Sequence, residues 1–214
     1  MRPAGVVFDL DGTLVDSRRD LATAVNATRQ RLALRPLQLE EVVAMVGEGA
    51  RVLLRRALPA TVTEEDFETA LGLFLDLYLE CCVDTTQPYP GIADLLRALA
   101  PRYPLFVLTN KPGRHSRRIL DGLGLGEFFV AVIGGDTLPA RKPDPAGLHA
   151  IAGRLGTTAP RLLLVGDSGI DANTAAAAGT PLALVAWGYG RPAELADVPA
   201  WRLAEPRELL AGLA

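Results

Sequence analysis

The sequence predicts an α/β protein in which a doubly wound, mostly parallel sheet carries an inserted all-helical segment. From Gly91 onwards, short apolar runs alternate with helical patterns, as expected for βαβ units joined by right-handed crossovers. One more apolar strand, Val6–Leu10, stands near the start of the chain. Between them, about Asp16–Asp84 shows helical periodicity and no convincing strand. Both ends of this insertion meet the sheet near one place, so we expect residues 16–85 to form a cap and residues 1–15 and 86–214 the sheet domain.

Capping and breaking residues define the expected helices of the insertion. Asp16 or Ser17 caps a first helix, which Pro36 ends. Thr63 and Asp66 resemble a capping box before a long helix. Its apolar residues recur at spacings of three and four, which is typical of helix packing. The expected helices are 17–34, 39–46, 50–58 and one from 63, with the stripe Phe67, Leu71, Phe74, Leu75 and Tyr78.

The alternating part of the chain gives a regular series of elements. Its predicted strands are short and apolar on both faces, as in a parallel sheet covered by helices on both sides. The expected strands are Leu105–Leu108, Phe129–Ile133, Leu162–Val165 and Leu182–Ala186. The expected helices are Gly91–Ala100, Pro112–Leu120, Pro145–Leu155, Ile170–Ala178 and Pro206–Ala211.

Composition narrows the class of protein. Apolar residues make up 49% of the chain and charged residues 22%, which is ordinary for a globular protein. The net charge of -3 argues against nucleic acid as a partner. The only cysteines, Cys81 and Cys82, are adjacent and imply no disulfide framework. With neither a signal-peptide pattern nor a transmembrane segment in view, we expect a cytoplasmic monomer or homodimer that binds no membrane.

The stretch VVFDLDGTL contains the first candidate site. In an extended chain, Asp9 and Asp11 would share one face, and Gly12 permits a sharp turn after them. Two carboxylates this close repel each other unless a cation or a shared proton relieves the repulsion. The pair is therefore a metal site, an acid/base device or a solvated turn.

Two further predicted strands end in polar residues. Thr109 and Asn110 follow one strand, and Asp167 follows another. The carboxyl ends of parallel strands meet at one edge of the sheet, which is where open α/β sheets bind ligands. We therefore expect these residues to converge on Asp9 and Asp11, and this convergence weakens the turn interpretation.

The expected cluster has the chemistry of a phosphoryl-transfer site. Asp171 adds a fourth carboxylate near the start of a helix, and such hard oxygen ligands suit Mg²⁺. Lys142 supplies a cation between a loop and a helix start. Carboxylates, Mg²⁺, a hydroxyl donor and a lysine together fit phosphoryl transfer. His115 and His149 are isolated, and we expect both on helix surfaces.

The pattern resembles the haloacid dehalogenase superfamily of phosphatases, with a Rossmann-like core and a helical cap between the first two motifs. Four motifs in the family's order carry the resemblance: Asp9-Leu10-Asp11-Gly12-Thr13, Thr109-Asn110, Lys142-Pro143, and Gly166-Asp167-Ser168 with Asp171. Four further short motifs most closely resemble the phosphoglycolate phosphatase branch: Val46-Gly47-Glu48-Gly49-Ala50, Pro88-Tyr89-Pro90-Gly91, Thr109-Asn110-Lys111-Pro112 and Ile133-Gly134-Gly135-Asp136.

The resemblance implies a catalytic role for four residues. Asp9 would be the nucleophile that forms an aspartyl-phosphate. Asp11 would be the general acid for the leaving oxygen and then the base for water. Thr109 would bind the phosphoryl group together with Asn110, and Lys142 would balance charge on Asp9 and the phosphate.

The resemblance also implies ligand contacts. Mg²⁺ would be held by Asp9, the Asp11 backbone carbonyl, Asp167 and Asp171, the last directly or through water. Thr13 would support the first motif, and Gly12 would lie at the substrate. Arg51 of the cap is a candidate partner for a substrate carboxylate, although a solvated helix arginine is an equally good interpretation.

The implied function is Mg²⁺-dependent hydrolysis of a small phosphate monoester, with 2-phosphoglycolate and its product glycolate favoured. A sugar-phosphate phosphatase or mutase and a pyrophosphatase are alternatives, because the core motifs barely distinguish them. A phospho-accepting receiver module shares the carboxylates, Thr and Lys, but has adjacent acidic residues and no large helical insertion. A catalytically dead member is disfavoured because every catalytic position holds a competent residue.

Overall fold

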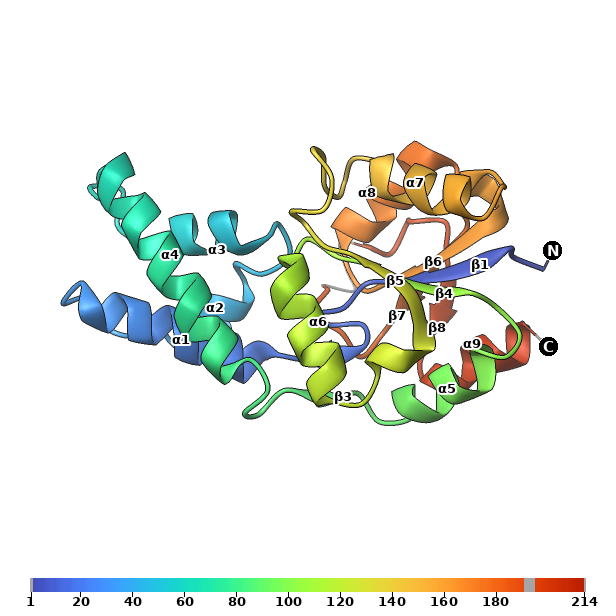
Figure 1. Ribbon diagram of the computed structural model, residues 1–214, viewed down its shortest axis with the longest axis horizontal. Helices are drawn as coiled ribbons and strands as arrows, with labels where there is room; N and C mark the ends of the chain where they lie inside the picture. The colour runs from blue at the N-terminus through green and yellow to red at the C-terminus, as the bar shows by residue number, and fades with distance from the viewer. Residues whose placement is uncertain (1, 191–194, 214) are drawn as a thin grey trace.

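Strand β1 (Gly5–Phe8) lies inside a six-stranded sheet, between β4 and β6 (Figure 1). The computed structural model describes residues 2–190 and 195–213. Within them the strand order is β5-β4-β1-β6-β7-β8, and every pairing is parallel. The other strands are β4 (Leu105–Leu108), β5 (Phe129–Ile133), β6 (Leu162–Gly166), β7 (Leu182–Val185) and β8 (Trp201–Leu203).

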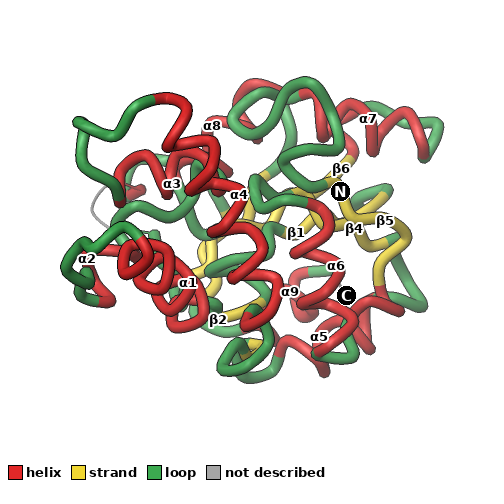
Figure 2. Tube along the Cα trace, turned by 60° about the vertical axis from the view of Figure 1, so that its left-hand side comes forward, coloured by secondary structure: helices red, strands yellow, loops and turns green. Residues whose placement is uncertain are grey.

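Helices cover both faces of this sheet, which confirms the doubly wound fold. Along β1, Val7 belongs to one buried apolar cluster and Val6 and Phe8 to another, because side chains alternate between the faces. Figure 2 shows the strands between two groups of helices. The Val7 face is covered by α7 (Ala146–Arg154) and α8 (Gly169–Ala178), and the Val6 face by α5 (Ile92–Leu99), α6 (Gly113–Gly122) and α9 (Pro206–Gly212).

The insertion forms four helices within the described residues, set to one side of the sheet (Figure 1). The Thr63 side chain accepts a hydrogen bond from the Asp66 backbone N–H, at 3.2 Å, and so caps the long helix. The expected capping box is only half formed, because the Asp66 carboxylate accepts the Thr63 hydroxyl, at 2.8 Å, and not the Thr63 backbone N–H. Phe67, Phe74 and Tyr78 of the predicted stripe are buried. The helices are α1 (Arg18–Arg31), α2 (Leu39–Val43), α3 (Ala50–Ala57) and α4 (Glu64–Cys81).

Several expected boundaries were wrong. The first strand ends at Phe8, two residues early, because the chain bends after it. The first helix ends at Arg31, and Ala33 beyond it has a left-handed φ of 55°. The unpredicted elements are β2 (Val15–Asp16), β3 (Gln87–Pro88), β8 and the 3₁₀ turns η1 (Gly126–Phe128) and η2 (Ala159–Arg161).

The two chain crossings between sheet and insertion are held side by side. Strands β2 and β3 pair antiparallel, with Val15 opposite Pro88. Next to them, the buried Asp20 carboxylate accepts hydrogen bonds from the backbone N–H and the hydroxyl of both Thr85 and Thr86, at 2.5–3.1 Å. Both ends of the insertion therefore meet the sheet at one place.

His115 was expected on a helix surface and is instead 5% exposed. Its Nε2 lies 2.8 Å from the Leu75 carbonyl oxygen, and its ring stacks on Tyr78 at 5.4 Å. The histidine thus joins α6 to α4, whereas His149 is exposed as expected. In the part of the chain that the structure describes, no helix combines the length and the apolar character needed to cross a membrane.

We expect Asp20→Asn to lower the free energy of unfolding by about 2 kcal/mol, because an amide N–H₂ would then face donors of Thr85 and Thr86. Hydrogen bonds from these threonines outweigh burial and hold the pKa of Asp20 below its usual value. The stabilisation is therefore present at neutral pH and is lost as the pH falls through that lowered value. Urea unfolding at neutral pH and near pH 3 measures both effects.

The exposed neighbour Asp84 offers a matched control. Asp84→Asn should leave the unfolding free energy within about 0.5 kcal/mol of the wild type. Equal stabilities for the two variants would contradict the role given to the Asp20 carboxylate.

Candidate active site

The candidate site lies at the carboxyl ends of β1, β4 and β6, where the predicted residues do converge. A cavity of about 440 Å³ separates this edge of the sheet from the helices of the insertion. Polar residues from the sheet line one side, and mostly apolar residues from the insertion line the other. The polar side includes Asp9, Asp11, Thr109, Asn110, Lys111 and Asp167; the opposite side includes Val46, Ala50, Leu53, Phe74 and Tyr78.

The loop after β1, which contains Gly12 and Thr13, packs around the Asp167 carboxylate. Gly12 has a φ of 81°, and a Cβ there would overlap this carboxylate, so both conformation and space require glycine. Thr13 donates its hydroxyl to Asp167 Oδ1 at 3.1 Å. The Tyr189 and Gly190 backbone N–H groups donate to Oδ2 at 2.7 and 3.2 Å. Asp167 is therefore fixed from two loops, and Gly12 lies against a carboxylate.

Lys142 joins two of the predicted acidic residues. Its Nζ lies 2.9 Å from Asp9 Oδ1 and 2.6 Å from Asp171 Oδ1, and its side chain is 2% exposed. Burial opposes its charge, but Asp171 and Asp9 raise the pKa of Lys142 above its usual value. The other oxygen of Asp171 accepts from the Ser168 N–H and hydroxyl, which completes a capping box at the start of α8.

Three buried carboxylates form a group suited to a cation. Asp9, Asp167 and Asp171 each offer an oxygen within 4.8 Å of the others. Burial raises the pKa of Asp9 to about 7 even though Lys142 opposes the shift, and the other two carboxylates add to it. Burial and Asp171 raise the pKa of Asp167 to about 6. These raised pKa values reflect burial and, in part, repulsion among the three carboxylates when all are charged. A divalent cation would relieve this repulsion, and oxygen ligands suit such an ion.

Asp11 has different partners from Asp9. Its Oδ1 accepts hydrogen bonds from the Ser17 hydroxyl at 2.5 Å and from Lys111 Nζ at 2.6 Å. Its side chain is not part of the group of three carboxylates. The two aspartates are thus separated in role, one beside Lys142 and the other beside Lys111. Sequence reasoning gave Lys111 no role, although the residue follows Thr109 and Asn110 directly in a quoted motif.

Thr109 and Asn110 line the cavity, but their side chains differ in what they contact. Both hydrogens of the Asn110 amide are donated, to the Gly47 carbonyl at 3.0 Å and to the Lys142 carbonyl at 2.9 Å. Its Oδ1 is buried and accepts no hydrogen bond from the described residues. The Asn110 side chain therefore ties the insertion to the Lys142 loop, whereas Thr109 lines the cavity and its Oγ1 accepts the Lys111 backbone N–H.

Of the predicted site residues, Gly12, Lys142 and Asp171 lie outside the cavity lining but next to Asp9 or Asp167, which line it. Arg51 is the one that the structure places apart from this cluster. It lies outside the cavity lining, with its guanidinium paired to Glu68 at 2.6 and 2.8 Å. Its side chain is 47% exposed. The solvated helix arginine is the interpretation that this geometry favours.

Comparisons with known proteins show what this chain is similar to. A family model described as haloacid dehalogenase-like hydrolase matches residues 3–179. The phosphoglycolate phosphatase of Pseudomonas putida is 43% identical over 220 residues, which covers 99% of this chain and 80% of that protein. The one from Rhodospirillum rubrum is 44% identical, covering 88% and 82%. A crystal structure described as a predicted phosphoglycolate phosphatase from Haemophilus somnus has a TM-score of 0.94 at 31% identity, covering 100% of this chain and 99% of that one.

We expect a divalent cation to stabilise the protein more at about pH 8 than at about pH 5. With raised pKa values, Asp9 and Asp167 hold protons in the folded protein that the unfolded chain has released. Without a cation, stability from these groups therefore falls as the pH rises from about 4 to about 7. Mg²⁺ at about 100 times its dissociation constant should add about 2.7 kcal/mol, or about 5–10 °C in melting temperature.

Melting curves with Mg²⁺ or with a chelator, at both pH values, measure this difference. Asp167→Asn should lose most of the shift. The control Asp84→Asn changes an exposed residue outside the carboxylate group and should keep the shift. An equal shift at both pH values, or an undiminished shift in Asp167→Asn, would contradict the cation site.

Proposed function

The chain belongs to the haloacid dehalogenase-like hydrolases and is a phosphatase-type enzyme of that family, and we propose that it hydrolyses 2-phosphoglycolate to glycolate and phosphate. The observation that carries the proposal is the pair formed by Asp9 and Lys142, 2.9 Å apart and next to further buried carboxylates. The names of the two bacterial relatives support the choice of substrate.

Asp9 acts as the nucleophile in this proposal. One of its oxygens forms a bond to phosphorus while the bond from phosphorus to the ester oxygen breaks, and Asp11 gives the departing oxygen a proton. In the second step Asp11 takes a proton from water. The oxygen of that water bonds to phosphorus, the bond to Asp9 breaks, and phosphate leaves. Lys142 offsets negative charge on the phosphoryl oxygens, and the Thr109 hydroxyl donates a hydrogen bond that positions them.

The metal of the proposal is Mg²⁺, which the donor set of buried carboxylates fits. Asp9, Asp167 and the Asp11 backbone carbonyl would hold it. Asp171, whose oxygens accept hydrogen bonds from Lys142 and from Ser168, would contact the metal directly or through water. When bound, the ion offsets negative charge on the nucleophile and the phosphoryl group.

Residues 16–85 act as the cap in this proposal, and residues 1–15 and 86–214 as the catalytic domain. The insertion supplies the apolar side of the cavity, including Leu53 and Phe74. These side chains exclude bulk water from the aspartyl-phosphate and contact the leaving group. The cap therefore contributes to the choice of ester, while the sheet edge sets the reaction.

We expect Mg²⁺-dependent release of phosphate from small monoesters, with the highest kcat/KM for 2-phosphoglycolate. A panel that also holds hexose phosphates and pyrophosphate, assayed for free phosphate, tests both the reaction and the substrate. Asp9→Asn serves as the blank for contaminating phosphatases. No release from any ester would refute the phosphatase proposal, whereas a preference for a hexose phosphate or pyrophosphate would refute only the substrate.

Substitution of Asp9 and substitution of Asp11 should block different steps of the reaction. Asp9→Asn removes the nucleophile, so no acid-stable labelled aspartyl-phosphate should form. Asp11→Asn should lower kcat about 10²–10⁴-fold for 2-phosphoglycolate, yet accumulate the phospho-enzyme from p-nitrophenyl phosphate, whose leaving group needs no proton. Rapid quench and peptide mapping identify the labelled residue. Label on another residue, or full turnover by Asp9→Asn, would refute the assignment.

A further inference from the structure

We propose that Lys111 binds the carboxylate of the substrate's leaving group and that Tyr78 of the insertion positions it. The inference rests on the proposed function and names the group that recognises the second anionic end of the substrate. It also replaces Arg51 in that role.

The charges around the cavity single out Lys111. Among the described residues that line the cavity, Lys111 alone carries a positive side chain. The other buried lysine nearby, Lys142, is bonded to Asp9 and Asp171, and Arg51 is paired with Glu68. An anionic leaving group in this cavity therefore has one cationic partner among the described residues, and a buried carboxylate without such a partner is costly.

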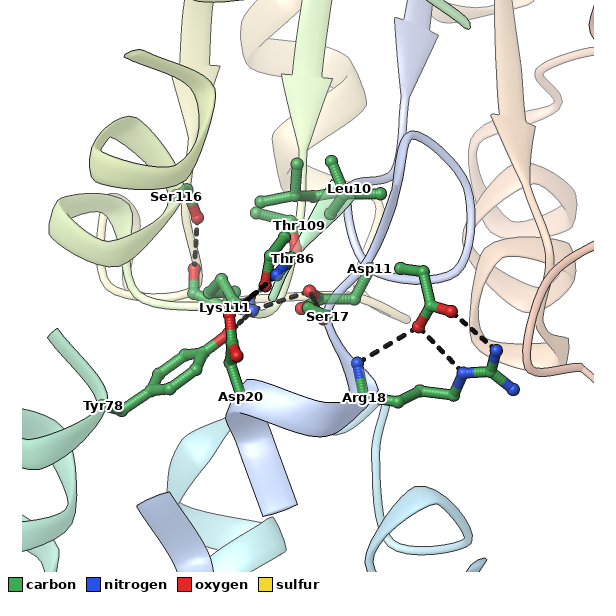
Figure 3. A network of polar contacts seen from close by, with 12 residues as sticks. Leu10, Asp11, Ser17, Arg18, Asp20, Tyr78, Thr86, Thr109, Lys111 and Ser116 are labelled. Carbon is green, nitrogen blue, oxygen red and sulfur yellow. Dashed lines mark hydrogen bonds and ion pairs between the residues drawn. The ribbon is translucent and has the colours of Figure 1, made fainter. Parts of the chain in front are cut away.

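The ammonium group of Lys111 has capacity for a further acceptor. Its side chain is 3% exposed, and Nζ donates to Asp11 Oδ1 at 2.6 Å and to the Tyr78 hydroxyl at 2.5 Å (Figure 3). An ammonium group carries three N–H donors. These two contacts use two of them, so the third can go to a ligand carboxylate.

The position of Lys111 suits a short substrate with two anionic ends. Thr109 and Lys111 are two residues apart in the loop after β4, and both line the cavity. Thr109 Oγ1 accepts the Lys111 backbone N–H at 3.2 Å, which holds the loop in a tight bend. A phosphoryl group at Thr109 and a carboxylate at Lys111 therefore need only a few bonds between them.

Tyr78 connects this lysine to the insertion. The residue belongs to α4, its ring stacks on Phe74 at 5.9 Å and on His115 at 5.4 Å, and Lys111 Nζ lies 4.7 Å from the ring centroid. Its hydroxyl is the contact from the insertion that fixes Nζ (Figure 3). Tyr78 is thus a positioning residue, which couples recognition of the carboxylate to the seating of α4.

A pair of esters that differ only in the anionic end tests the inference. In 2-hydroxyethyl phosphate a CH₂OH group replaces the carboxylate of 2-phosphoglycolate. Lys111→Met should lower kcat/KM about 100-fold for 2-phosphoglycolate and at most about 10-fold for the hydroxyethyl ester, because a charged hydrogen bond is lost only with the former. An equal fall for both would overturn the inference, since Lys111 would then serve only to position Asp11.

Binding without turnover gives a second readout. By calorimetry the wild type should bind 3-phosphonopropionate at least about 10-fold more tightly than 3-hydroxypropylphosphonate, and Lys111→Met should lose this preference. Tyr78→Phe keeps the ring and the lysine, so a folded variant is expected, with the preference reduced about 3–10-fold. A wild type without preference, or a preference unchanged in both variants, would overturn the inference.

The two proposals fail separately. If the wild type hydrolyses esters with a neutral leaving group as well as it hydrolyses 2-phosphoglycolate, the protein remains a phosphatase and the role of Lys111 is refuted. A wild type that hydrolyses no ester refutes the proposed function, and the phosphonate pair still decides whether Lys111 recognises a carboxylate.

Discussion

The compensation of buried negative charge at one edge of the sheet is the constraint on which the rest of the site depends. Unpaired carboxylates away from water are costly, so each needs a built partner. Asp171 and Asp9 share the ammonium of Lys142, while backbone N–H groups and the Thr13 hydroxyl support Asp167. The partners come from separate loops, so the correct fold of every loop is required before the charges are tolerated.

This constraint also explains how two aspartates in one short motif come to differ. An unbroken strand would place Asp9 and Asp11 on one face, as the sequence suggests. The structure ends β1 at Phe8 instead, and the Leu10 N–H turns back to Asp9 Oδ1 at 2.7 Å. The bend sends one carboxylate to Lys142 and the other to Lys111. Asp9 and Asp11 thereby contact different lysines, which offsets the repulsion between them.

Much of the fold followed from the sequence because its signals are local. The strands at 105–108 and 129–133 were predicted with their observed bounds, since apolar runs between turn residues identify buried strands. Strands β2 and β3 have two residues each, too few for any periodicity. The convergence of Asp9, Thr109 and Asp167 followed from parallel topology alone. The contact of Lys111 with Tyr78, 33 residues earlier in the chain, could not, because it depends on how α4 packs.

The paired crossings at β2 and β3 have a consequence for how such enzymes diversify. Val15 and Pro88 are paired neighbours, so the residues between them form a loop whose two ends are already held together. The length of this loop has little effect on the stability of the sheet. Doubling a loop costs only about 0.6 kcal/mol in closure entropy. A different set of helices could therefore replace the insertion between β2 and β3 while β1, β4 and β6 keep their order. The range of substrates would then change while the catalytic residues at the sheet edge stay the same.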